Sequence, residues 1–199
     1  MFDGSPVRAL RSTYRGPAIL TEIASEAWQV RAYHDLRRAV FVGEQALFDS
    51  TDADEVDATA LAIVAMTVCH GMPDQVVGTV RIFRRPTDPP DVWFGGRLAV
   101  DPAYRRHGSI GEGLIRAAVC SAHALGCREF LATVQLPVVR YFERHRFAVR
   151  ESVDVCGIPH ALMQAELEHY PAQYYGKREV TDGLERGMDA SCPRRPEAA

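Results

Sequence analysis

The stretch from Arg97 to Arg116 constrains the fold most, because it combines a strand, a turn, a basic glycine loop and the start of a helix. Residues 97–100 suit a strand, and apolar residues recur three to five positions apart over residues 110–125, which predicts a helix. Such a loop leaves backbone N–H groups unpaired at the positive end of the helix dipole, where phosphate oxygens bind well. Arg105 and Arg106 add permanent positive charge. The stretch predicts a diphosphate-binding loop, although basic glycine turns before helices also occur as plain solvated connections.

The bulk composition indicates one sizeable domain with tails. The chain has 199 residues, 47% of them apolar and 25% charged, and its net charge of −3 argues against general binding of nucleic acid. Of its 23 lysine and arginine residues, all but Lys177 are arginine. The sequence therefore excludes a phosphate-binding loop of the GK[ST] type and a Schiff-base lysine in the predicted core.

The cysteine pattern indicates the redox compartment and limits the metal sites that the chain can form. They number five, are widely spaced and contain no CxxC pair, so we expect free thiols in a reducing compartment. Cys120, His123 and Cys127 share one side of the predicted helix, but a site needs three or four convergent ligands, and we expect no metal. Residues 1–16 lack a signal-peptide core, and the longest apolar run, residues 58–69, is too short to span a bilayer. We therefore expect a cytoplasmic protein without membrane contact.

The periodicity along the chain predicts alternating strands and helices. Helical spacing of apolar residues predicts a helix from Tyr33 to Phe41, and we place a strand before it at residues 27–30. Further strands are predicted at residues 58–68, 75–84, 92–100, 129–134, 147–155 and 161–167, and a short helix at 137–145.

This order predicts an α/β (α+β) fold in which a mixed, mostly antiparallel central sheet of six to seven strands carries helices on both faces. We assign residues 1–26 to a lead-in, residues 27–169 to the domain, and residues 170–199 to a tail that is mobile or peripheral, because apolar periodicity is lost there.

Several motifs and their order resemble the GCN5-related N-acetyltransferase (GNAT) superfamily over roughly residues 27–167. The basic glycine loop stands between the fourth strand and the central helix, as in that family. Phe-Val-Gly-Glu-Gln at residues 41–45, followed by acidic residues, and Gly-Ile-Pro-His at residues 157–160 resemble the ElaA-like branch in particular. A related Phe-Val-x-Glu-Gln stretch is found in acyl-homoserine lactone synthases, which share the fold. The resemblance implies the GNAT fold and an acyltransferase activity.

The resemblance also implies a cofactor, acetyl-CoA or another acyl-CoA, whose pantetheine arm pairs with the fourth strand as an added strand would. The residues assigned to it are Leu98, Ala99, Val100, Arg105, Arg106, His107, Gly108, Ser109, Ile110, Gly111, Gln135 and Phe142. The family's loop usually reads R/Q-x-x-G-x-G/A, and this chain departs from it in either register. A start at Arg105 puts Ile110 at the last small position. A start at Arg106 puts Ser109 at the middle glycine and Gly111 at the last, and we prefer it because the helix then begins in step.

Acyl transfer to an amine needs a deprotonated amine, a hydrogen-bond donor for the carbonyl oxyanion and an acid for the leaving thiolate. By resemblance, Glu44 is the candidate base or amine-orienting carboxylate, and the alternative is a surface residue or a structural partner of Arg97. Tyr141 is the candidate acid, but the family's helix reads F-Y-E-x-x-G-F, and here Phe142 holds the usual tyrosine position, where packing is its expected role. Either Tyr141 acts from a shifted position or the thiolate leaves without a tyrosine acid. Arg97 and His160 are further candidates for binding the acceptor.

The remaining features leave alternatives open. The acidic loop from Asp49 to Asp57 would attract a cationic amine, but a plain solvated loop fits equally well. Arg146 replaces the family's glycine after the short helix, which predicts a changed turn. The leading hypothesis is acetyl transfer to a small-molecule amine by direct attack. The alternatives are a lactone-synthase-like enzyme with a longer acyl donor and a non-catalytic acyl-CoA-binding module. Because dimers are common in the family, a homodimer is a further expectation.

Overall fold

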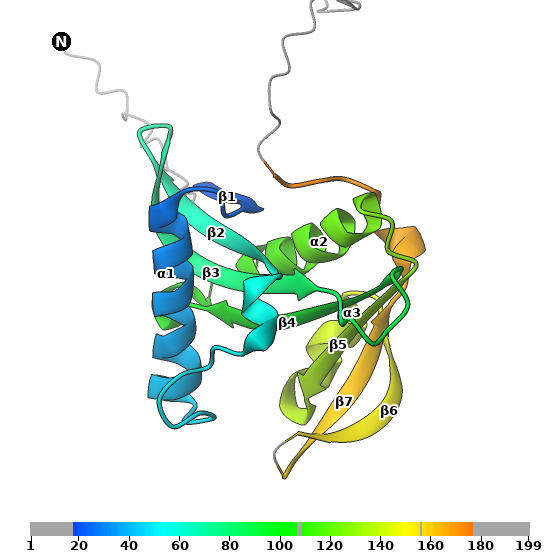
Figure 1. Ribbon diagram of the computed structural model, residues 1–199. Coiled ribbons are helices and arrows are strands. Elements are labelled where there is room, and N and C mark those ends of the chain that lie inside the picture. Colours follow the sequence, from blue (N-terminus) through cyan, green and yellow to red (C-terminus); the bar gives the residue numbers. More distant parts are fainter. Residues whose placement is uncertain (1–17, 107–108, 156, 177–199) are drawn as a thin grey trace, which may run out of the picture.

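The computed structural model describes residues 18–106, 109–155 and 157–176, which form a seven-stranded sheet with helices on both faces (Figure 1). In spatial order the strands are β1 (Ala18–Ile23), β2 (Leu61–Cys69), β3 (Met72–Phe83), β4 (Val92–Val100), β5 (Glu129–Gln135), β7 (Ile158–Ala165) and β6 (Phe147–Val155). The pairing of β4 with β5 is parallel, and the other pairings are antiparallel. The predicted fold class is confirmed.

The helices are α1 (Ala27–Arg38), α2 (Ser109–Ala124) and α3 (Val139–Arg144), with a π-helical segment, Ala39–Glu44, and 3₁₀ turns at Glu55–Ala58, Pro102–Tyr104, Leu136–Val138 and Leu167–His169. The two large helices cover opposite faces of the sheet (Figure 1). On one face, α2 packs against β1–β4, and its Ile110 and Leu114 belong to the core cluster on that side. On the other face, Tyr33 and Leu36 of α1 pack on Val64. The core therefore consists of two layers, one on each face of the sheet.

The predicted strand at residues 27–30 is wrong, because those residues form the first turn of α1. The helix begins with a capping box at Glu26, in which the Gln29 side-chain oxygen accepts hydrogen bonds from the backbone N–H groups of Ser25 (2.8 Å) and Glu26 (2.9 Å). These bonds satisfy N–H groups that would otherwise be unpaired at the helix start. The first strand, β1, lies earlier in the chain, within the predicted lead-in, and pairs with β2.

The chain after the last strand also joins the core. Tyr170, at the start of the predicted tail, is 6% exposed and its hydroxyl donates to the backbone carbonyl of His145. Further along, the carbonyl of Tyr175 accepts a hydrogen bond from the N–H of Ile23 at 3.0 Å. Both β1 and the segment from Tyr170 to Tyr175 therefore contact the core.

Helix α1 continues directly into the π-helical segment Ala39–Glu44, which the sequence predicted only as the end of the helix or a second short one. The widened hydrogen bonding continues at its end, where the Gln45 N–H donates to the Val40 carbonyl at 2.9 Å. Val40 and Phe41 are buried, so the segment is fixed against the sheet while Glu44 is exposed. Single π-helical turns are frequent at functional sites, and this one places the Glu44–Gln45 pair.

Candidate active site

The central sheet opens in the middle, where β4 and β5 part. Their described pairing runs from Val92 opposite Glu129 to Gly95 opposite Ala132. Over the remainder of β4, residues 96–100, the structure gives no ladder with β5, while pairing with β3 resumes at Ala99 and Val100. One edge of this half of β4 therefore faces an opening instead of a neighbouring strand. Such an edge can accept an extended ligand as an added strand.

The opening coincides with a β-bulge at Arg97. Pairing with β3 is regular at Thr79–Ala99 and again at Arg81–Gly96, so β4 holds an extra residue between these points. Arg97 has φ 54°, in the left-handed region that L residues rarely adopt, and such a conformation costs about 1–3 kcal/mol. Bulges bend the strand that carries them, and this one lies where β4 turns away from β5.

The side chain of Arg97 is held by the acidic loop. Its Nη2 and Nε donate to the Asp52 carbonyl oxygen at 2.8 Å and 3.2 Å, and Nη2 also reaches an Asp54 carboxylate oxygen at 3.3 Å. The guanidinium stacks on the Phe48 ring, 4.6 Å from its centroid. These contacts stabilise the bulge and thereby the opening.

Two further arginines bind the same loop from beneath. Arg37 of α1, whose side chain is fully buried, contacts Asp52 at 2.7 Å and both carboxylate oxygens of Asp57 at 2.7 Å and 2.9 Å. Arg81 of β3 forms a fork on Asp54, at 2.6 Å to each oxygen, and reaches Asp57 at 2.7 Å. Burial opposes ionisation of Asp57, but hydrogen bonds from Arg37 and Arg81 outweigh it and hold the pKa of Asp57 well below its usual range.

We call this cluster of three arginines and three aspartates the bulge network. It bears on both interpretations of the acidic loop. Its members are Arg37, Asp52, Asp54, Asp57, Arg81 and Arg97. Three carboxylates of the loop are already paired with arginines, so they are neither a plain solvated loop nor free to attract an amine. The sequence did not indicate the network, because each arginine lies far along the chain from its partners.

Glu44 lies at the end of the π-helical segment. Its two carboxylate oxygens accept from Nη1 and Nη2 of Arg105, each at 2.6 Å, and both side chains are about 40% exposed. Arg105 also donates from Nε to the Val100 carbonyl at 2.9 Å, so the fork is anchored to β4. The hydrogen bonds from Arg105 lower the pKa of Glu44. The partner of Glu44 is therefore Arg105 and not Arg97.

Gln45 and Gln135 connect the same segment to β5. Gln135, at the end of β5, donates from Nε2 to Gln45 Oε1 at 3.4 Å. The Glu44–Gln45 pair therefore contacts Arg105 after β4 with one side chain and the end of β5 with the other, and so it spans the opening. Gln45 was not among the predicted site residues, although it lies in the motif that carried the family resemblance. His160 of β7 pairs with Gln135 of β5 and is 9% exposed. Its Nδ1 is hydrogen-bonded to the Ile158 carbonyl of its own turn at 2.8 Å.

The predicted diphosphate loop ends in the first turn of α2. Ser109 opens the helix, Ile110 is 1% exposed in the core, and Gly111 is buried. A Cβ added at position 111 would lie 2.6 Å from the hydroxyl oxygen of Tyr141, so only glycine allows this contact. This supports the register in which Gly111 holds the last small position. His107 and Gly108 lie outside the described residues.

Tyr141 and Phe142 occupy different environments on α3. The Tyr141 hydroxyl lies against the first turn of α2, and burial raises the pKa of Tyr141, so the phenol keeps its proton at neutral pH. Phe142 is 9% exposed and packs edge-on against Phe147. Its contacts are those of a core residue, in line with the packing role expected for it, and its assignment to the donor site stays a prediction.

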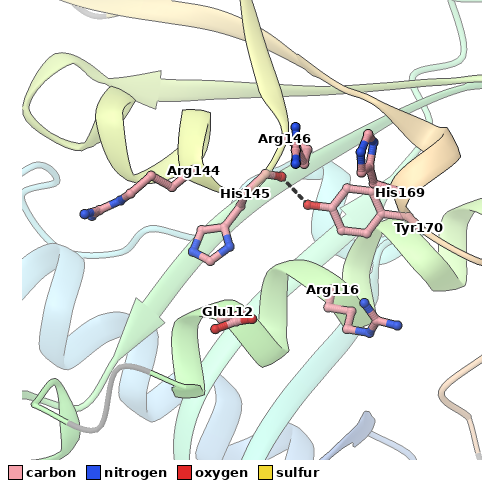
Figure 2. Close-up of a pocket in the computed structure, with 7 residues that line it drawn as sticks. All are labelled: Glu112, Arg116, Arg144, His145, Arg146, His169 and Tyr170. Carbon is pink, nitrogen blue, oxygen red and sulfur yellow. Dashed lines mark hydrogen bonds between the residues drawn. The ribbon is translucent and has the colours of Figure 1, made fainter.

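A second hollow, about 200 Å³ in volume, lies on the surface between α2 and α3, beside the Tyr141 contact. Figure 2 shows its lining residues, which are Glu112, Arg116, Arg144, His145, Arg146, His169 and Tyr170. None of them was assigned to a site from the sequence, in which Arg146 was noted only as a changed turn. Among the described residues, no three His, Cys, Asp or Glu side chains gather as metal ligands, and no helix there is long and apolar enough to cross a membrane.

The central sheet parts beside a helix N-terminus whose first N–H groups can bind phosphate. The family model of the GNAT acetyltransferases matches residues 20–147, which is more than half of the chain. The chain therefore belongs to the GNAT acetyltransferase family, whose members use an acyl-CoA donor. No curated protein matches the sequence as a relative.

Solved structures share this fold. A protein from Lactobacillus plantarum assigned as an N-acetyltransferase is 25% identical, with a TM-score of 0.65 over 75% of this chain and 99% of that one. ElaA from Escherichia coli is 22% identical, with a TM-score of 0.61 over 76% of this chain and 100% of that one. The acyl-homoserine lactone synthase LasI is 15% identical, with a TM-score of 0.60 over 76% and 91%, and shares the fold.

Proposed function

We propose that this protein is an acyl-CoA-dependent N-acyltransferase that moves an acetyl group to the amine of a small molecule in a ternary complex. One observation carries the proposal: β4 parts from β5 beside the first turn of α2, and the Glu44–Gln45 pair spans the opening. Family membership supports the acyl donor, and the amine acceptor and acetyl chain are our inference.

The residues around the opening fit a CoA thioester. The free edge of β4 at Leu98 and Val100 offers backbone groups to the amides of a pantetheine arm, although the Val100 carbonyl already accepts from Arg105. The first N–H groups of α2, from Ser109 to Gly111, suit diphosphate oxygens. When bound, an acyl-CoA supplies an activated thioester carbonyl, whose C–S bond is replaced by a C–N bond.

We assign Glu44 to orienting the amine in preference to acting as a strong base. Its pKa is lowered by Arg105, and a carboxylate of low proton affinity removes a proton less readily. It stays ionised at neutral pH and can hold an ammonium or amine N–H at the mouth of the opening. A bound ammonium first releases one proton to water. The neutral amine then attacks the thioester carbonyl, and its second proton passes to water as the C–S bond breaks and the CoA thiolate leaves.

Tyr141 is better placed to bind the acyl-CoA molecule than to protonate the leaving thiolate. Its hydroxyl lies against Gly111, in the turn proposed for the diphosphate, and its raised pKa keeps it a hydrogen-bond donor. We therefore place Tyr141 at the phosphate or pantetheine portion of the donor. The thiolate leaves without a tyrosine acid, as the shift of one residue relative to the family's helix allows.

The proposal is tested by following CoA release from acetyl-CoA, and from a longer acyl-CoA, with a panel of small primary amines. We expect turnover with acetyl-CoA that depends on the amine, and a lower kcat for Glu44→Gln. Turnover with the longer donor alone would favour the alternative of a lactone-synthase-like enzyme. LasI, an enzyme of that kind, shares the fold of this chain. Donor binding without turnover on any amine would favour a non-catalytic binding module.

A further inference from the structure

The hollow between α2 and α3 contains an excess of arginine. Arg116 comes from α2, and Arg144 and Arg146 come from the end of α3 and the turn after it. Within the part of the chain that the structure describes, none of the three has a carboxylate at ion-pair distance, and Arg144 instead lies 5.8 Å from the centroid of the Tyr141 ring. The single carboxylate in the lining is Glu112. We call Arg116, Arg144 and Arg146 the pocket arginines.

The charge of this pocket matches a phosphate monoester. Three guanidinium groups and one carboxylate leave two positive charges, and a phosphate monoester carries about −1.5 to −2 at neutral pH. Burial lowers the pKa of His145, so its ring adds hydrogen-bonding capacity more than charge. Arg116 and Arg144 lie on opposite sides of the pocket, with His145 and Glu112 between them (Figure 2). Long arginine stems can bring their planar forks onto a phosphate from both sides.

The backbone at Arg146 adds an independent observation. Arg146 has φ 60°, in the left-handed region, at the turn that ends α3. The turn is held by hydrogen bonds from the Arg146 N–H to Glu143 (3.1 Å), from the Glu166 N–H to Arg146 (2.9 Å), and from the Tyr170 hydroxyl to the carbonyl of His145. Glycine would adopt this conformation without strain. A strained residue that glycine could replace is expected where its side chain has a function, and the side chain here lines the pocket.

We propose that the pocket between α2 and α3 binds a phosphate monoester through Arg116, Arg144 and Arg146. Its position favours the ribose 3′-phosphate of CoA as the source, because the pocket begins at Glu112, the residue after Gly111. Arg116 lies five residues beyond Gly111, about 7.5 Å along the helix axis. The phosphates of one CoA molecule can therefore occupy the first turn of α2 and the pocket together. This choice of source rests on the proposed function, whereas the affinity for a phosphate monoester does not.

The test is titration calorimetry with CoA, 3′-dephospho-CoA and inorganic phosphate on the wild type and three variants. Arg116→Gln and Arg146→Gly each remove one pocket arginine, and Arg146→Gly also relieves backbone strain, so its folding is secure. Arg31→Gln removes an exposed arginine of α1 and serves as the matched control. We expect the wild type to bind CoA at least tenfold more tightly than 3′-dephospho-CoA. Each pocket variant should lose about tenfold for CoA and little for 3′-dephospho-CoA, and the control should lose neither.

The remaining outcomes separate the two proposals. Two results together would overturn the phosphate site and leave the proposed function standing. Every protein would bind CoA and 3′-dephospho-CoA equally, and inorganic phosphate would either not bind or bind Arg146→Gly as well as the wild type. If inorganic phosphate binds and Arg146→Gly abolishes that binding, the site stands with another phosphate monoester as its source. If neither CoA compound binds, the proposed function fails, and the phosphate titration alone decides on the pocket.

Discussion

Arg97 and Arg146 share an unusual backbone conformation but differ in what surrounds their side chains. Both have positive φ, 54° and 60°, where an L residue is strained. Arg97 contacts Asp52 and Asp54 in the bulge network, so its strain is offset by bonds within the protein. Arg146 lines a pocket with two other arginines and no carboxylate partner among the described residues. The contacts of Arg97 hold the fold around the opening despite the strain. We attribute the strain at Arg146 to the binding of a ligand.

The largest effect is expected from breaking the bulge network at its buried centre. Arg37→Ala leaves Asp52 and Asp57 without their main partner in a buried site, which costs about 3–5 kcal/mol of unfolding free energy. Urea unfolding of the variant beside Arg116→Gln checks this, since the pocket arginine should change stability by no more than about 0.5 kcal/mol. Similar losses for both variants would erase the distinction between the two groups of arginines.

Arg105 is an intermediate case, because it is paired with Glu44 and yet exposed. Because the pair lies at the opening, Glu44→Gln should leave the unfolding midpoint unchanged and lower kcat about a hundredfold. The dissociation constant of acetyl-CoA should stay the same, since the residue is assigned to the acceptor. Steady-state kinetics with a responsive amine, combined with calorimetry, separates these quantities. An unchanged kcat would remove Glu44 from the acceptor site.

Acid should weaken the bulge network. The pKa of Asp57 is lower in the folded protein than its value of about 3.9 in an unfolded chain, so its contribution is fully present above about pH 5 and is lost as the pH falls below that. Asp57→Asn should cost about 2 kcal/mol at pH 7, and the difference from the wild type should shrink by pH 3. Urea unfolding at the two pH values measures it. A difference that is constant with pH would contradict the ionised network.

Relief of backbone strain at Arg146 and Arg97 should give the smallest effect, and its sign should differ between the two positions. Arg146→Gly should raise stability by about 1 kcal/mol, because glycine accepts the left-handed conformation and no internal ion pair is lost. Arg97→Gly relieves the same strain but removes contacts with Asp52 and Asp54, so it should destabilise the protein. Chemical unfolding of both variants decides the signs. A loss at position 146 would mean that its arginine contributes to stability within the fold.

The sequence predicted the regions where periodicity is strong and local. The boundaries of β4 and β6 agree with the structure, and the central helix was placed correctly, because apolar spacing and turn residues mark these elements. The start of α1 was missed because its capping box uses Glu26 and Gln29 in place of the more familiar serine or threonine. Its first turn then looked like a strand.

The candidate site was predictable only in part. Glu44 and the glycine loop could be singled out as candidates because they lie in short motifs, whereas the partners of the acidic loop depend on tertiary pairing. Arg37 lies 15 residues from Asp52, and Arg97 lies 45 residues from it, and no local pattern links them. The contact between Tyr141 and Gly111 likewise depends on how α3 packs against α2, which spacing within either helix does not determine.

Amide hydrogen exchange with and without acetyl-CoA tests the central claim most directly, because it reports on the backbone edge that the donor should occupy. We expect slower exchange at residues 98–100 of β4 and at residues 109–112 of α2, with the hairpin of β2 and β3 unchanged away from the opening. No slowing at β4 and α2 under saturating acetyl-CoA, or slowing confined to other elements, would contradict the donor site at the parting of β4 and β5.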